Sequence, residues 1–342
     1  MKALVLTEYK KMEILDVPMP VIQDDEVLIR VKACGICGSD IHGYDGSTGR
    51  RRPPIIMGHE ASGIIVETGP KVENWKKDDR VTFDSTIYCG RCSYCNKGMV
   101  NLCENRRVLG VSCEEYHRDG AFAEYVAVPQ HILYALPDSV SYDQAALVEP
   151  LSIAAHAVDI SPHLLDASAT VIGTGMVGLF VIQALRAKGY GKIIAVDHNQ
   201  SKLDLALKLG ADEAVLSDGH ALEKILPLTN GRGTDASFEV AGTSEAFNLA
   251  VHSVCKGGSV TLVGNSSPKV DLPLQTIVTR QIRLQGSCAS SGEYPACLNL
   301  IARGQVDVNS IISATAPLDE GPMWFDKLYH RNGPRLKVVL NP

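Results

Sequence analysis

The segment TVIGTGMVG, residues 170–178, joins an apolar run to a G-x-G-x-x-G turn, and a helix-compatible segment follows directly. In that setting such a turn binds a dinucleotide pyrophosphate on backbone N–H groups at a helix N-terminus. The pattern alone is weak in a chain with 30 glycines. Its support comes from the next predicted strand, 192–196, which ends at Asp197, where an acid binds a ribose 2′-hydroxyl.

Downstream of this turn, predicted strands and helices alternate. Helices are expected at 201–209, at 220–226 before Pro227, and at 244–255 before Gly257-Gly258; strands are expected at 214–216, 236–240, 259–263 and 282–285. Repeated βα units build a parallel, doubly wound sheet. Residues 151–286 are therefore predicted to form an α/β, Rossmann-type domain.

The rest of the chain has a different pattern. A length of 342 residues favours two domains. Residues 1–150 contain short strand-like runs, such as 27–31, 63–66 and 80–83, separated by turn residues, which predicts an irregular, β-rich domain. Residues 287–342 lose the βα regularity and end in a strand-like run at 336–340. We expect this last segment to return to the first domain.

Composition excludes several classes of protein. A formal net charge of −6 and a pI near 5.9 argue against a nucleic-acid partner. The chain contains no run of roughly 18 apolar residues, so we expect no membrane span. The apolar start at Met1 is interrupted by Glu8 and Lys10, too early for a secretion signal. These features predict a cytoplasmic protein with an ordinary buried core.

Four of the ten cysteines lie within fifteen residues, at Cys89, Cys92, Cys95 and Cys103. Four thiolates at this spacing close a tetrahedral zinc site that has no vacant position. Disulfides and four unrelated cysteines are the alternatives. Such tight clustering in an expected reducing compartment favours a structural zinc.

A second set of metal-ligand residue types lies earlier in the chain. The segment CGICGSDIH spans residues 34–42, and Gly58-His59-Glu60 follows it. A cysteine, a histidine and a carboxylate are the ligand types of an open, catalytic zinc site. A lone cysteine or histidine is more often a buried packing residue. The nearby cysteine quartet and the dinucleotide turn favour the catalytic reading, because hydride transfer from an alcohol requires a Lewis acid and a nicotinamide.

These motifs, together with DGAFAEY at 119–125 and VEPL at 148–151, resemble those of the medium-chain, zinc-dependent alcohol and polyol dehydrogenase family along nearly the whole chain. The resemblance implies a GroES-like catalytic domain followed by a Rossmann cofactor domain. It also implies that Cys37 and His59 bind the catalytic zinc. Ordinary alcohol dehydrogenases have a cysteine as the third ligand. This chain has Glu149 at the matching position, and in this it resembles sorbitol and galactitol-phosphate dehydrogenases. Glu149 is ranked slightly above Glu60 as the third ligand.

The resemblance further assigns proton release to Ser39, which takes the alcohol proton, and to His42, which passes it to solvent. Asp40 is expected to orient His59. The alternatives without a catalytic role are that His42 is an ordinary surface histidine and that Asp40 is a turn-forming aspartate.

On the cofactor side, Asp197 favours NAD over NADP, because its carboxylate repels a 2′-phosphate. Lys202 is expected near the adenosine ribose and Lys337 near the pyrophosphate. The remaining expected dinucleotide contacts lie in the glycine turn and at the ends of later strands: Gly173, Gly175, Met176, Val177, Gly178, Ala241, Gly242, Val263, Gly264, Gly286 and Ser287.

The predicted function is NAD-dependent oxidation of a secondary alcohol of a polyol, sugar, sugar phosphate or sugar acid. An L-threonine dehydrogenase, a zinc-independent quinone reductase relative and a non-enzymatic dinucleotide-binding protein remain alternatives. Family members pair through their cofactor-domain sheets, which implies a homodimer or homotetramer. Arg50-Arg51-Arg52 either receives an anionic substrate group or is a solvated basic loop.

Overall fold

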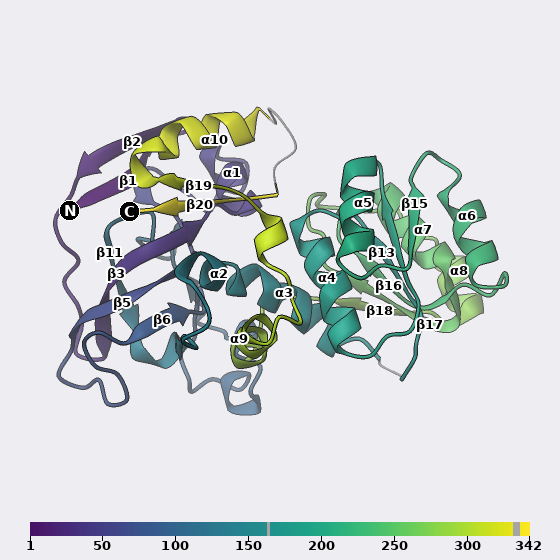
Figure 1. Cartoon of the computed structure of the whole chain (residues 1–342), viewed down its shortest axis with the longest axis horizontal. Helices are drawn as coiled ribbons and strands as arrows, with labels where there is room; N and C mark the ends of the chain where they lie inside the picture. Colours follow the sequence, from purple (N-terminus) through teal and green to yellow (C-terminus); the bar gives the residue numbers. More distant parts are fainter. Residues whose placement is uncertain (163–164, 331–335) are drawn as a thin grey trace. The chain divides into compact units, whose positions relative to one another are not determined.

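The computed structural model describes residues 1–162, 165–330 and 336–342. They form two compact units, both drawn in Figure 1. The first unit comprises Met1–Glu149, Tyr294–Ala302 and Val308–Pro342, and the second comprises Pro150–Glu293 and Arg303–Asp307. The chain therefore returns to the first unit twice after leaving it at Glu149.

The first unit is built from mostly antiparallel strands. Its largest sheet has the order β12-β6-β5-β3-β20-β19, with β11 also paired to β3, and a smaller sheet has the order β2-β1-β4. The strands of this unit are β1 (Lys2–Glu8), β2 (Lys11–Asp16), β3 (Glu26–Gly35), β4 (Ile55–Ile56), β5 (Glu60–Thr68), β6 (Arg80–Phe83), β7 (Thr86–Ile87), β8 (Arg107–Val108), β9 (Val111–Ser112), β10 (His117–Arg118), β11 (Tyr125–Pro129), β12 (Leu133–Ala135), β19 (Ile312–Pro317) and β20 (Lys337–Asn341).

Strand β3 is the centre of the first unit. Its apolar residues are buried on both faces, as expected of a strand covered on two sides. The C-terminal strand β20 runs antiparallel to it, with Leu340 opposite Cys34 and Val339 opposite Gly35. This pairing brings the last residues of the chain beside the segment that contains Cys37.

Short helices complete the first unit: α1 (Gly38–Tyr44), α2 (Tyr142–Ala146), α9 (Tyr294–Ala302) and α10 (Gly321–Tyr329). The ring of Phe325 on α10 packs edge-on against Phe122, with ring centroids 5.6 Å apart. Both rings are fully buried. Helix α10 thus closes the core of this unit, and Figure 1 shows it lying along β1 and β2.

The second unit contains a six-stranded parallel sheet with the order β15-β14-β13-β16-β17-β18. Its elements are β13 (Ala169–Ile172), α4 (Met176–Ala187), β14 (Ile193–Asp197), α5 (Gln200–Lys208), β15 (Glu213–Leu216), α6 (Ala221–Leu228), β16 (Thr234–Glu239), α7 (Ser244–Ser253), β17 (Val254–Leu262), α8 (Leu274–Arg280) and β18 (Arg283–Gly286). Helix α3 (Val148–Asp159) leads into this unit. The arrangement confirms the predicted doubly wound sheet.

Helices cover both faces of this sheet. In Figure 1, α4 and α5 lie on one side, and α6, α7 and α8 lie on the other. Phe247 and Ile225 contribute to a buried apolar cluster with strand residues such as Val196 and Val260. The strand order reverses at β13, and the glycine turn follows the carboxyl end of that strand. This is the point at which doubly wound sheets bind their ligands.

The largest differences from the expected boundaries in this unit involve α7, β17 and α6. The helix predicted to reach Cys255 ends at Ser253, and strand β17 begins at Val254. Helix α6 extends past the expected stop at Pro227, because a proline in the last turn disturbs few of the helix's hydrogen bonds. Neither difference moves a predicted site residue.

Candidate active site

Cys37 lies between strand β3 and helix α1. Its Sγ accepts a hydrogen bond from the backbone N–H of Ser39, at 3.5 Å. In return, Oδ2 of Asp40 accepts a bond from the backbone N–H of Cys37, at 3.1 Å. This reciprocal capping closes the first turn of α1 and holds the half-exposed thiol at the N-terminus of the helix.

His59 and Glu60 come from the start of strand β5. Gly58, just before them, has φ of +93°, and a side chain there would meet Phe122. The sharp turn places both residues against Cys37. One ligand atom each from Cys37, His59 and Glu60 lies within 4.8 Å of the other two. These are the residue types of an open zinc site.

One carboxylate oxygen of Glu60 is hydrogen-bonded, and the other has no donor in the described part of the chain. Its Oε2 accepts a bond from the ammonium of Lys337, at 2.5 Å, and Lys337 also donates to the carbonyl of Ile36. Oε1 of Glu60 is buried and has no hydrogen-bond partner among the described residues. A buried carboxylate oxygen without a donor is costly, and a metal ion satisfies it.

This geometry bears on two expectations that stay predictions. Lys337 is 1% exposed and bonded to Glu60 within the first unit, and its contact with the pyrophosphate stays a prediction. Glu60 is the carboxylate grouped with Cys37 and His59, and the ranking of Glu149 above it likewise stays a prediction.

Glu149 nevertheless lies near this group. It is in the first turn of α3, and its Oε1 accepts a bond from the hydroxyl of Ser85, at 3.4 Å. Burial raises the pKa of the Glu149 carboxyl to about 7, and the charges of Glu60 and Asp84 add to this effect against the opposing charge of His59. Such a carboxylate is suited to exchange protons near neutral pH.

The charged side chains around the site carry more negative than positive charge, as a divalent-cation site requires. The acidic groups are the Cys37 thiol and the carboxyls of Asp40, Glu60 and Glu149, and the cations are Arg51 and Lys337. Because Asp84 acts on Glu149 as well, the carboxyls outnumber the two cations in this largely buried space. A metal ion of charge +2 removes this imbalance, and the residues present therefore fit a catalytic zinc.

Ser39 and His42 lie one turn apart on α1, so their side chains share one face of the helix. His42 is exposed, and with Cys37 it lines a cavity of about 640 Å³. The remaining wall of this cavity comes from the C-terminal part of the first unit, including Tyr329 and Val338. The predicted proton-relay residues are thus both placed beside Cys37.

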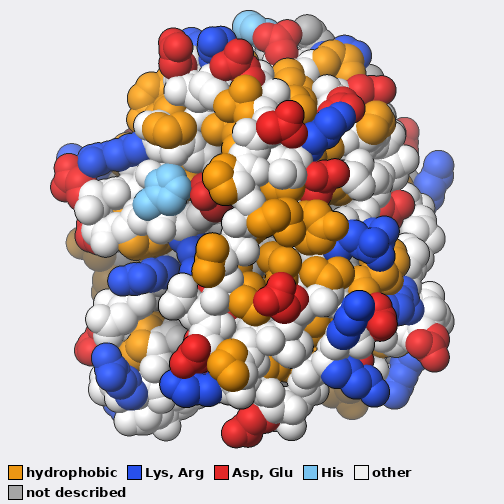
Figure 2. Space-filling model, turned by 90° about the vertical axis from the view of Figure 1, so that its left-hand side faces the viewer, with side chains coloured by type: hydrophobic (Ala, Val, Ile, Leu, Met, Phe, Trp, Pro, Cys, Tyr) orange, Lys and Arg blue, Asp and Glu red, His pale blue; other side chains and the backbone are white. Residues whose placement is uncertain are grey.

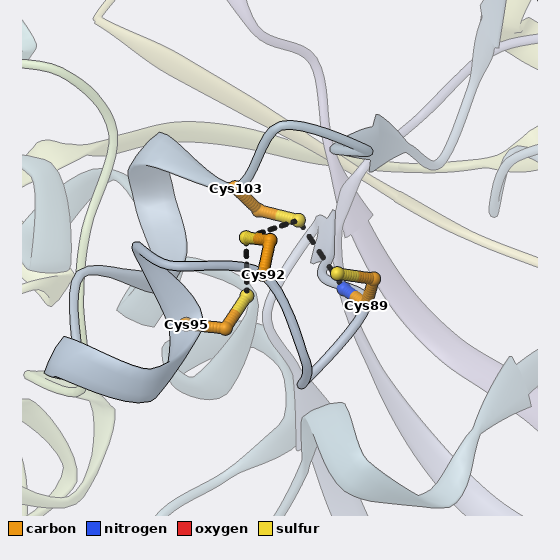
Figure 3. Close-up of side chains that lie close together, drawn as sticks. All are labelled: Cys89, Cys92, Cys95 and Cys103. Carbon is orange, nitrogen blue, oxygen red and sulfur yellow. Dashed lines mark hydrogen bonds between the residues drawn. The ribbon is translucent and has the colours of Figure 1, made fainter.

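The cysteine quartet forms a separate cluster, shown in Figure 3. The four Sγ atoms point toward one another, with Cys92 Sγ 3.5 Å from that of Cys95 and 3.9 Å from that of Cys103. A backbone bond from Arg91 is the main cause that lowers the pKa of Cys89 to about 6, whereas burial and the neighbouring thiols raise that of Cys95 to about 12. Four thiols this close ionise together only around a cation.

The second unit has a cavity of about 480 Å³ at the carboxyl ends of its central strands. Five of the predicted dinucleotide contacts line it: Gly173, Gly175, Asp197, Lys202 and Ala241. Asp197 ends β14, and its Oδ2 accepts a bond from the backbone N–H of Thr174, at 2.8 Å. Lys202 Nζ lies 3.8 Å from the same oxygen.

The other predicted contacts occupy neighbouring loops and turns. Met176, Val177 and Gly178 begin α4; Gly242 follows β16; Val263 and Gly264 follow β17; and Gly286 and Ser287 end and follow β18. The hydroxyls of Thr174 and Ser287 are buried without a partner among the described residues, which fits a bound polar ligand.

Sequence reasoning missed part of this site. Ser217, Thr243 and Leu249 also line the cavity, but they belong to no motif. Glu239 is buried at the end of β16, and its Oε1 accepts bonds from the backbone N–H groups of Ala241 and Gly242, at 2.8 and 2.7 Å. An acidic residue next to the end of the predicted strand 236–240 was the available sequence signal for Glu239.

Comparison with known proteins agrees with this geometry. Residues 23–138 match the model of the alcohol dehydrogenase GroES-like domain, and residues 176–303 match that of zinc-binding dehydrogenases. Sorbitol dehydrogenase of Bacillus subtilis is 35% identical over 100% of this chain and 97% of its own length. The chain belongs to the medium-chain, zinc-dependent alcohol and polyol dehydrogenase family.

Other members of this family extend the comparison. D-arabitol-phosphate dehydrogenase of Enterococcus avium is 34% identical over 98% of this chain and 95% of its own. Galactitol-1-phosphate dehydrogenase of Escherichia coli has a TM-score of 0.92 at 26% identity, covering 100% of both chains. A protein from Sinorhizobium meliloti 1021, solved with NADP, has a TM-score of 0.90 at 31% identity, covering 100% of this chain and 99% of that one.

The surface of this dehydrogenase carries charges of both signs. On the face of the first unit in Figure 2, lysine and arginine alternate with acidic and apolar side chains. This mixture gives no continuous basic field for a nucleic acid on that face. None of the helices in the described ranges combines the length and the apolarity needed to cross a bilayer.

Proposed function

We propose that this dehydrogenase oxidises a secondary alcohol of a polyol, sugar, sugar phosphate or sugar acid, with NAD as the hydride acceptor. The observation that carries the proposal is the grouping of Cys37, His59 and Glu60, with one buried carboxylate oxygen left for a metal. The extra carboxylates around this group suit a hydroxylated substrate better than a thiolate-rich site does. Relatives that act on sorbitol, arabitol phosphate and galactitol 1-phosphate support this substrate class.

Zinc bound by Cys37, His59 and Glu60 supplies a Lewis acid that favours the deprotonated alcohol. The chain's own residues then move the proton. Ser39, two residues past Cys37, accepts it from the substrate hydroxyl while releasing its own hydroxyl proton, and His42, one turn further along α1, receives the released proton and passes it to solvent. NAD held in the second-unit cavity would supply the acceptor for the hydride of the carbinol carbon. Glu149 serves as the second carboxylate near the metal.

NAD is the proposed cofactor because the second-unit cavity carries a carboxylate where a 2′-phosphate would lie. Asp197 and Glu245 both line it, and Lys202 is its one lysine, with no arginine among the described lining residues. A 2′-phosphate would meet uncompensated negative charge there.

The quaternary state and the location are proposed on other grounds. Strand β18 is an edge of the parallel sheet and is exposed along its length, which supports a homodimer, or a homotetramer built from dimers. The cysteine quartet requires reduced thiols to bind a metal, which supports the cytoplasm as the compartment.

Metal analysis and a substrate panel test the function together. We expect two zinc ions per chain, and NADH formation with sorbitol, xylitol, galactitol 1-phosphate or an aldonate. Cys37→Ser should lose one zinc and nearly all turnover, whereas Cys113→Ser, with a thiol outside both clusters, should retain both. Full polyol turnover by Cys37→Ser, or turnover with L-threonine alone, would overturn the proposal.

A further inference from the structure

The three consecutive arginines have three different environments. Arg50 Nη2 donates to the hydroxyl of Tyr116, at 3.4 Å, and Arg52 Nη2 donates to Glu114, at 2.8 Å. Both contacts are exposed. Arg51, between them, is only 5% exposed. A buried arginine in a surface loop is neither a solvated charge nor a free anion receptor.

The backbone of this loop is fixed against strand β9. Arg52 N–H donates to the carbonyl of Ser112, at 3.0 Å, and Ser112 N–H donates to the carbonyl of Arg50, at 3.2 Å. These two bonds turn the Arg51 side chain inward. The stem of Arg51 then packs on Gly43 of α1, where a methyl group would lie 2.2 Å from Arg51 Cγ.

The guanidinium of Arg51 points to Asp40, the fully buried acid of α1. Arg51 Nη2 lies 3.6 Å from Asp40 Oδ1, and His59 Nδ1 lies 3.4 Å from the same oxygen. Both distances suit a charge interaction, although neither contact has hydrogen-bond geometry. The other oxygen, Oδ2, is held by the backbone of Cys37. Asp40 Oδ1 therefore lies between a guanidinium and the imidazole of a proposed zinc ligand.

We infer that Arg51 is a positioning residue for the catalytic metal, acting through Asp40 on His59. This inference rests on the zinc site of the proposed function. Arg51 Nη2 and His59 Nδ1 approach the same carboxylate oxygen of Asp40. Arg51 thus fixes the direction of that oxygen toward Nδ1, and with Nδ1 facing Asp40 the other ring nitrogen, Nε2, is left for the metal.

Gly43 provides an independent way to test the contact. It lies on the same helix as Asp40, and its backbone does not have a positive φ, so alanine is compatible with the helix. A methyl group there displaces the stem of Arg51 and leaves all three charged groups in the chain. Gly43→Ala should therefore weaken the same contact that Arg51→Met removes.

The experiment compares zinc retention against a chelator in the full-length protein. The four-cysteine zinc serves as the internal reference. In Arg51→Met we expect the affinity for the other zinc to fall by roughly 10- to 100-fold. The cobalt-substituted form should show a shifted visible absorption band. Arg51→Lys, which restores a cation, should recover most of the affinity.

Matched controls come from the same loop. Arg50→Met and Arg52→Met remove exposed charges and should release zinc as the unchanged protein does. If Arg51→Met fails to fold, Gly43→Ala carries the test with the same expected fall. A folded Arg51→Met or Gly43→Ala with unchanged zinc affinity and cobalt spectrum overturns the inference. If the unchanged protein itself holds only one zinc, the proposed function fails instead.

Discussion

Gly175 and Gly178 have different physical roles within one short turn. A methyl group on Gly175 would meet no atom within 4 Å, whereas one on Gly178 would lie 1.9 Å from the carbonyl oxygen of Gly173. Gly175→Ala should keep the unfolding free energy within about 0.5 kcal/mol. It should nevertheless raise the dissociation constant for NAD by about tenfold or more, ~1.4 kcal/mol, because the methyl occupies ligand space.

Gly178→Ala should instead destabilise the second unit by roughly 1–3 kcal/mol, since the obstructing atom is backbone. Urea unfolding and NAD titration of both variants check the pair. If Gly175→Ala binds NAD as tightly as the unchanged protein, the pyrophosphate does not lie on this turn.

The Lys337–Glu60 pair permits a second residue-scale prediction. Their side chains are 1% and 0% exposed. Without metal at the catalytic site, Lys337→Met leaves a buried carboxylate without a cation, and we expect a loss of about 3–5 kcal/mol of unfolding free energy. Adding Glu60→Gln should recover part of that loss in a double-mutant cycle.

The matched control is Lys71→Met. Lys71 and Asp24 form a pair with 73% and 62% exposed side chains, so removing that lysine should cost less than about 1 kcal/mol. Urea unfolding of all four variants gives the comparison. Equal stability of Lys337→Met and Lys71→Met would show that the buried pair is energetically unimportant.

At the residue scale, the sequence indicates the candidate metal ligands more directly than it indicates the residues that hold them in place. Cys37 and His59 belong to short motifs, and the resemblance of these motifs to a known family predicts them as ligands. The neighbours of Glu60 were not predictable, because Lys337 lies 277 residues away and meets it only through the pairing of β20 with β3. Arg51 was hidden for a related reason: a run of three arginines does not show which one is buried.

At the scale of elements, prediction succeeded where one periodicity dominated. Strand β6 has the expected bounds, and β14, β15, β16 and α5 differ from expectation by one or two residues at an end. The prediction is wrong at residues 254–258, because Gly257 and Gly258 are expected to stop a helix and instead belong to strand β17. A glycine pair indicates a change of backbone conformation, but it does not show in which element the change occurs. Here the change lies within a strand, because Gly257 has φ of +76°.

Asp235 ties the starts of strands β13 and β16 together. Its Oδ2 accepts bonds from the N–H and the hydroxyl of Ser168, at 2.9 and 2.7 Å, and Arg232 donates to Oδ1. Burial alone raises the pKa of this carboxyl, but the bonds from Ser168 and the charge of Arg232 outweigh it and hold the pKa below its usual value. Asp235→Asn should therefore cost roughly 1–2 kcal/mol of unfolding free energy near neutral pH.

The pH dependence of that cost follows from the lowered pKa. The carboxylate stabilises the folded state fully above its unfolded pKa of about 3.9, and this stabilisation is lost as the pH falls through the lower folded value. The difference between the unchanged protein and Asp235→Asn should thus be constant down to about pH 5 and shrink below about pH 4. Urea midpoints measured across this range check it, with the exposed Asp204→Asn as the control. A difference that grows on acidification would contradict the argument.

At the scale of the whole molecule, one surface of the second unit exposes a strand edge, unpaired within the described residues, and a group of apolar side chains. All four residues of β18 are exposed, and α8 beside it has no buried residue. Apolar side chains gather here: Val270, Leu272, Leu274, Val278 and Leu284 are 38–67% exposed. An open strand edge flanked by apolar side chains is a site of association in most proteins that retain one.

A second copy of the chain, related by a twofold axis, would pair its β18 with this one and extend the sheet across both protomers. Val278 is 67% exposed, so lysine at that position harms the isolated unit little but places a charge in the proposed interface. We expect Val278→Lys to shift the protein from dimer or tetramer toward monomer in light scattering. Leu207→Lys, a matched change at a 42% exposed leucine on α5, should leave the assembly unchanged. A Val278→Lys protein with the mass of the unchanged assembly would place the interface elsewhere, because a buried, unpaired lysine at a pairing edge costs several kcal/mol and would not be tolerated there.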